Sequence, residues 1–158
     1  MGQSDFALCG TELGNSRPTM NTAITIGGLQ LSFEPLKYSF PSSPKLRDPI
    51  AITAKVKTPF SETTAERLCI PFADLVIFRN KLKRFLRRED DGVVSLSVLM
   101  PSLDITFISR TGDRVMADIR LSPDLRLERH LYDFELTWNE VSRIGSDFDL
   151  LLVSLPLN

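Results

Sequence analysis

Residues 72–88 place the strongest constraint on how this chain can fold. Five apolar side chains recur there three, four, three and one residues apart, which predicts an amphipathic helix. They are Leu75, Phe78, Leu82, Phe85 and Leu86. Burying them is worth roughly 10 kcal/mol, at about 1.5–3 kcal/mol each, before the entropy of ordering them is subtracted. The helix therefore requires an apolar surface to lie on, and the rest of the chain has to supply it.

Segments of alternating apolar and polar residues, the pattern of half-buried strands, occur on both sides of this helix. They cover residues 23–26, 29–34, 36–40, 50–57, 65–70, 93–100, 103–110, 114–121 and 125–137. Because Pro35 separates the second from the third, those two form one bent strand or two short ones. Short turns such as Thr111-Gly112-Asp113 favour antiparallel neighbours. The sequence predicts about seven or eight mostly antiparallel strands.

A second amphipathic helix is predicted at the C-terminal end. Thr137 and Glu140 have the spacing of a capping box, in which each residue satisfies a backbone N–H of the other. The apolar positions that follow share one helical face: Val141, Ile144, Phe148, Leu151, Leu152 and Leu155. Gly145 indicates either a close approach to the sheet or a weak point in the helix. Two amphipathic helices packed on a mostly antiparallel sheet predict the α+β class.

Residues 1–21 are rich in Gly, Ser, Asn and Thr, and we expect them to be a poorly ordered leader before a single α+β domain at 22–158. The net charge of −1 provides no field that would attract nucleic acid or an anionic membrane. The apolar run at 150–157 is too short to span a bilayer. Only two cysteines occur, so we expect neither a structural disulfide framework nor a zinc site, and we predict that Cys69 is a small buried side chain. These features favour the cytoplasm.

Little in the sequence indicates catalysis. His130 is the only histidine, and we place it opposite the apolar positions of its strand, as a surface or hydrogen-bonded residue. No phosphate-binding loop, nucleophile elbow or metal-ligand spacing is present. We therefore predict no catalytic residue, no metal site and no cofactor. A small enzymatic or ligand-binding domain, with a pocket between helix and sheet, stays open as the alternative.

The charged residues are distributed unevenly along the chain. Residues 79–88 carry six basic side chains and no acid, whereas residues 133–149 carry five acidic side chains against Arg143, a local charge of −4. We expect these to be either solvated helix faces or surfaces that steer a partner of opposite sign. The candidate partner-binding residues, on the helix face away from the core, are Lys81, Arg84, Arg87 and Arg88.

The order of elements, together with the pattern Gly-Leu-x-Leu-x-Phe-x-x-Leu-x-Tyr-x-Phe-Pro at 28–41 and Asp48 before the strand at 50–57, resembles a bacterial family. Over roughly residues 24–155 the chain is similar to WapI-type immunity proteins, which protect bacteria from secreted polymorphic toxins. The resemblance implies a non-enzymatic protein that neutralises a cognate toxin by occluding it. Immunity proteins against nucleases are often acidic, so the basic helix argues against a nuclease as the toxin.

Overall fold

The computed structural model describes residues 23–35, 49–89, 91–98, 102–124 and 128–155. The predictions of a leader at 1–21 and of a strand at 36–40 lie outside these residues. Within them the chain forms the following elements. They are β1 (Ala23–Ile26), β2 (Leu29–Pro35), β3 (Pro49–Lys57), β4 (Glu62–Pro71), α2 (Phe72–Leu86), β5 (Val93–Val98), β6 (Ser102–Ser109), β7 (Arg114–Ser122), β8 (His130–Thr137) and α3 (Trp138–Ser154). The predicted α+β class is confirmed.

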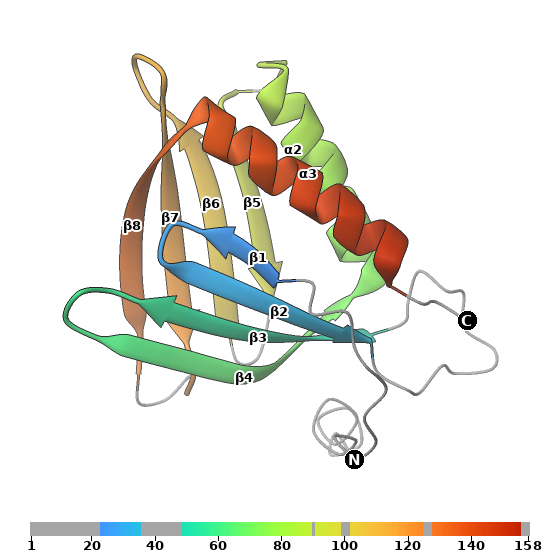
Figure 1. Ribbon diagram of the computed structural model, residues 1–158, viewed down its shortest axis with the longest axis vertical. Coiled ribbons are helices and arrows are strands. Elements are labelled where there is room, and N and C mark those ends of the chain that lie inside the picture. The colour runs from blue at the N-terminus through green and yellow to red at the C-terminus, as the bar shows by residue number, and fades with distance from the viewer. Residues whose placement is uncertain (1–22, 36–48, 90, 99–101, 125–127, 156–158) are drawn as a thin grey trace.

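The described strands form two antiparallel four-stranded sheets, each in chain order, β1-β2-β3-β4 and β5-β6-β7-β8. The sequence led us to expect one sheet. The division falls at α2, because 15 helical residues carry the chain about 22 Å at 1.5 Å per residue before the next strand begins. Figure 1 shows α2 and α3 side by side across one side of the molecule, with the two sheets curving away beneath them.

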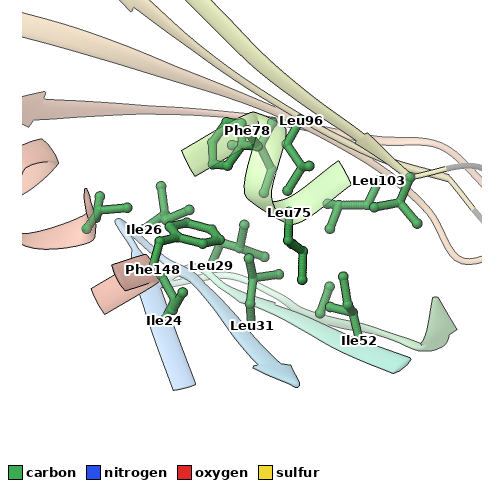
Figure 2. Packing of buried hydrophobic residues seen from close by; sticks show 14 of the residues in the cluster. Ile24, Ile26, Leu29, Leu31, Ile52, Leu75, Phe78, Leu96, Leu103 and Phe148 are labelled. Atoms are coloured by element: carbon green, nitrogen blue, oxygen red, sulfur yellow. The ribbon is translucent and has the colours of Figure 1, made fainter. Parts of the chain in front are cut away.

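One hydrophobic core joins both sheets and both helices. Alternate residues of most strands point into it, as Ile24, Leu31 and Ile52 do from the first sheet, whereas the alternation in β4 is interrupted by an irregularity between Ala65 and Leu68. Figure 2 shows Leu75 and Phe78 of α2 and Phe148 of α3 between residues of the two sheets. The helices therefore pack their apolar faces against both sheets, while their opposite faces are exposed.

The two helices follow their predicted patterns closely. In α2 the buried residues include Leu75, Phe78, Leu82 and Phe85, whereas Leu86 is only half-buried. At α3 the predicted capping box is confirmed: Glu140 N–H donates to Thr137 Oγ1 at 3.2 Å, and Thr137 N–H donates to Glu140 Oε2 at 2.6 Å. The hydrogen bond from the Thr137 backbone holds the pKa of the Glu140 carboxyl below its ordinary value.

Two glycines mark places where elements come close. A Cβ at Gly145 would lie 3.1 Å from Leu86 Cδ1, so this glycine lets α3 approach α2 and not the sheet, which corrects one of our expectations. A Cβ at Gly28 would lie 2.5 Å from the Lys57 carbonyl oxygen and 2.9 Å from Phe134 Cε1. The β1–β2 turn therefore packs against β8 and holds the two sheets together at that end.

Cys69 differs from its prediction. It is half-buried at the β4 edge of its sheet and is disulfide-bonded. The expectation of a small buried side chain without a disulfide was therefore wrong.

Truncating the core side chains that the helices supply should destabilise the protein strongly. We expect Leu82→Ala and Phe148→Ala each to lower the free energy of unfolding by about 2–5 kcal/mol in urea denaturation, because both side chains are fully buried. Val153→Ala is the control, since Val153 is 87% exposed on the same helix as Phe148. Losses at Leu82 and Phe148 no larger than at Val153 would show that the helices are not part of the core.

Candidate functional site

Burial of the apolar face of α2 determines where its basic side chains point. Its apolar stripe is buried, so the charged positions between the buried ones must point sideways or outward. The helix ends at Arg87, whose backbone N–H donates to the Lys83 carbonyl oxygen at 3.1 Å. Arg88 follows with φ 57°, a left-handed conformation that breaks the helical spacing. The four candidate residues therefore cannot all share one helical face.

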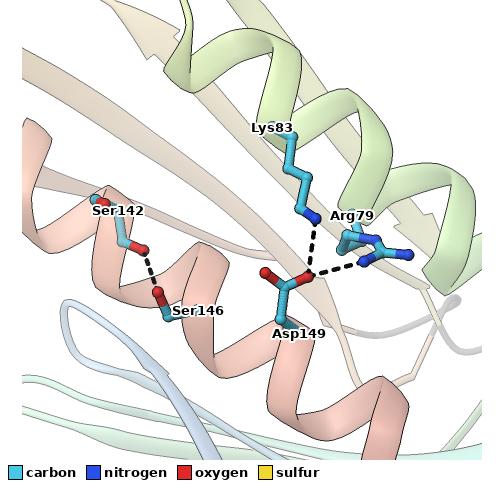
Figure 3. Close-up of polar contacts among 5 residues, drawn as sticks. All are labelled: Arg79, Lys83, Ser142, Ser146 and Asp149. Carbon is cyan, nitrogen blue, oxygen red and sulfur yellow. Dashed lines mark hydrogen bonds and ion pairs between the residues drawn. The ribbon is translucent and has the colours of Figure 1, made fainter.

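Two basic residues of α2 are paired with α3. Asp149 Oδ1 accepts a hydrogen bond from Arg79 Nη1 at 2.9 Å and lies 3.5 Å from Lys83 Nζ. Figure 3 shows both side chains reaching across the gap between the antiparallel helices to this one carboxylate. The acidic C-terminal stretch thus neutralises part of the basic stretch within the molecule. Neither Arg79 nor Lys83 belongs to the predicted partner-binding set.

Lys81 and Arg84 come together on the opposite side of α2. They line a hollow of about 480 Å³ between the end of the helix and β5. Its other lining residues are Glu89, Asp91, Val93, Val94 and Ser95. Two cations and two carboxylates balance within it, so the positive field is weaker than the sequence alone suggests. The hollow suits a group that carries both donors and acceptors better than a pure anion.

Arg88 is placed elsewhere. Its guanidinium carbon lies 4.7 Å from the centroid of the Trp138 ring, at the start of α3, and its Nη2 lies 4.0 Å from Asp113 Oδ1. The stacking on Trp138 is a cation–π contact, which holds the left-handed end of α2 against α3. Arg87 is exposed beside it. All four candidate side chains are exposed, but only Lys81 and Arg84 line a common site.

His130 occupies a different part of the molecule. It lies on the same side of β8 as Tyr132 and Phe134, so placing it opposite the apolar positions was wrong. Its ring stacks on Tyr132 with centroids 6.2 Å apart, and its Nε2 lies 3.2 Å from Glu128 Oε2. The Tyr132 hydroxyl in turn donates to Thr63 Oγ1 of β4 at 2.9 Å. The predicted hydrogen-bonded histidine is found, at the end of an aromatic row between the sheets.

Two further searches cover only the residues that the structure describes. No group of three or more His, Cys, Asp or Glu side chains among them is arranged to hold a metal ion. None of the helices in this part of the chain is long and apolar enough to cross a membrane.

Sequence reasoning missed Asp149 as the residue that joins the two helices. The available signal was the opposite charge of residues 79–88 and 133–149, which indicated attraction but not which pairs would form. The acidic helix pairs with Arg79 and Lys83 because these two side chains face α3 once the apolar stripe is buried.

Comparison with known proteins identifies one family. The family model described as immunity protein WapI-like family matches residues 22–156. The match covers every element of both sheets and both helices. No curated protein matches the chain. The resemblance that the sequence patterns indicated is confirmed.

Removing the shared carboxylate should weaken the contact between α2 and α3. We expect Asp149→Asn to lower the free energy of unfolding by about 1–2 kcal/mol at low salt, because a part-buried arginine loses its charged acceptor. The loss should shrink in 1 M NaCl, where the Debye length is about 3 Å. Asp147→Asn removes the same charge two residues earlier on the same helix. Equal losses for the two variants in urea denaturation would rule out a specific role for Asp149.

Proposed function

This chain belongs to the immunity protein WapI-like family, and we propose on that basis that it binds a cognate toxin protein and neutralises it by covering a functional surface of the toxin. In this proposal the protein acts by binding and not by catalysis. The observation that carries the proposal is the extent of the family match, which includes the whole core and not one local motif.

The packing supports a protein that binds as a preformed body. Both sheets and both helices share one core, and its largest fully buried side chains include Phe78, Phe85, Phe107 and Phe148. Such packing leaves little backbone to rearrange, so the surface presented to a partner is ready before the encounter. Preorganisation lowers the entropic cost of association, which matters when a toxin has to be captured quickly.

We propose the exposed basic end of α2 as a surface that steers an acidic partner toward the protein. Its members are the residues selected from the sequence, Lys81, Arg84, Arg87 and Arg88. Arg79 and Lys83 face Asp149 on α3, whereas Lys81 and Arg84 lie on the β5 side of α2 and Arg87 and Arg88 follow its last residue. Exposed charges act chiefly on the association rate and only weakly on the final affinity.

The compartment that we propose is the bacterial cytoplasm, because a neutralising protein must meet the toxin where the toxin acts. Cytosolic thiols are kept reduced, so the disulfide at Cys69 is the observation that counts against this compartment. Cys69 found as a free thiol in the cell would support the cytoplasm, and Cys69 found in a disulfide would contradict it.

One observation favours a second candidate function. The hollow of about 480 Å³ lies between a helix and a sheet, where a ligand-binding domain would have its pocket. His130 is not among its lining residues, so an activity at this site would depend on Lys81 and Arg84 instead. Saturable binding of a small molecule that Lys81→Ala abolishes would favour this candidate over toxin neutralisation.

Co-expression tests the leading function directly. The toxin domain encoded by the reading frame next to this one should arrest growth when it is expressed alone. We expect co-expression of the present chain to restore growth, and the two purified proteins to form a complex in size-exclusion chromatography. Growth arrest that persists despite soluble expression of the chain, with no complex formed, would contradict the proposal.

Charge reversal tests the steering surface. We expect the double variant Arg84→Glu and Arg87→Glu to slow association with the toxin domain by about tenfold at low salt, with less difference at 0.5 M NaCl. The matched control is Arg120→Glu with Arg129→Glu, which changes the net charge equally at exposed positions toward the other end of the second sheet. Stopped-flow association rates that fall equally in both double variants would show a general charge effect and no steering surface on α2.

A further inference from the structure

Phe60 is the most exposed large hydrophobic residue among those that the structure describes, with 97% of its surface accessible. It lies on the turn between β3 and β4, which projects at the end of the sheet away from the two helices (Figure 1). No packing role within the fold explains a phenylalanine at this position. Turns are usually built from Gly, Pro, Asn, Asp and Ser, and the geometry of this one does not require an aromatic ring.

The backbone that carries the ring is nevertheless held firmly. Thr58 Oγ1 accepts hydrogen bonds from the backbone N–H groups of Phe60, at 3.3 Å, and Ser61, at 3.0 Å. The Thr58 N–H donates to the Ser61 carbonyl oxygen at 2.8 Å, and Pro59 restricts its own φ. The ring is therefore presented to solvent from a fixed position. Burying it in a partner would cost little conformational entropy, since only two side-chain torsions have to be ordered.

Charged residues lie on the strands that flank the turn carrying the ring. Lys55 Nζ and Glu62 Oε1 form an ion pair at 2.9 Å across the base of the turn, and Lys57 is exposed beside it. We call Lys55, Lys57 and Glu62 the collar of the turn, and their net charge is +1. An apolar centre with a polar, exposed rim is the usual anatomy of an energetically dominant interface residue. The collar matches a partner surface that is neutral or slightly acidic around an apolar pocket.

A second copy of this chain is a poor partner for the ring. The hollow between α2 and β5 is lined mostly by charged and hydroxyl-bearing residues, which would lose hydration against a phenyl ring. One projecting side chain also buries far less than the roughly 800 Å² per partner of a stable interface. The partner must therefore supply an apolar pocket for the ring, and the contact must also include surface of both proteins around it.

We propose that Phe60 is the aromatic anchor of the toxin interface, inserting from the β3–β4 turn into an apolar pocket on the toxin. This inference rests on the proposed function, and it names the residue that holds the complex together once the partners have met. The basic end of α2 raises the rate at which the partners associate, whereas Phe60 lowers the rate at which the complex dissociates.

The test measures binding of the full-length chain to the purified toxin domain from the neighbouring reading frame, in a catalytically inactive form, by surface plasmon resonance. Phe60→Ala should raise the Kd at least about tenfold, mainly through faster dissociation. Phe60→Leu should lose less, because it keeps an apolar side chain. Val153→Ala is the matched control, since Val153 is 87% exposed on α3. Melting temperatures should be equal for all variants.

The outcomes separate the two proposals. Binding by the wild-type chain with an unchanged Kd for Phe60→Ala overturns the anchor and leaves toxin neutralisation standing. No binding by the wild-type chain overturns toxin neutralisation itself, and the anchor with it. Sedimentation that shows a wild-type dimer, lost in Phe60→Ala, would assign the ring to a second copy and overturn its assignment to the toxin.

Discussion

The edge-to-face contact between Phe78 of α2 and Phe148 of α3 is the interaction on which the rest of the structure depends. The ring centroids lie 5.1 Å apart at an interplanar angle of 69°. Phe78 also stacks on Phe107 of the second sheet, and Phe148 contacts Phe33 of the first. The described strands form two separate sheets, and these ring contacts link both sheets to the helices in one core.

Burying that aromatic cluster decides where every charge on α2 points. Arg79 and Lys83 are directed to α3 and share Asp149, while Lys81 and Arg84 are directed to β5. The electrostatics of the surface are thus a consequence of packing. Arg79 and Lys83 contribute to the contact between the helices, whereas the exposed charges at the end of α2 are the ones that we propose to act on a partner.

The proposed mode of action divides binding between two surfaces that the fold keeps apart. The end of α2 carries charge that acts over about a Debye length, and the β3–β4 turn carries one apolar ring that acts only in contact. Each surface is held by a rigid part of the backbone. The charges lie at the end of a helix packed on the core, and Phe60 lies on a hydrogen-bonded turn. Neither surface requires the backbone to rearrange, which suits a protein that has to recognise one partner rapidly.

The sequence by itself determined the elements of this protein. Apolar periodicity and capping are local, so the strands, the two helices and the Thr137–Glu140 capping box could be predicted within a few residues. Only the tertiary structure decided which of those elements contact one another. The split into two sheets, the approach of Gly145 to α2, and the separation of Arg88 from Lys81 and Arg84 all depend on residues far away in the chain. A local pattern shows which face a side chain occupies, but not what lies opposite that face.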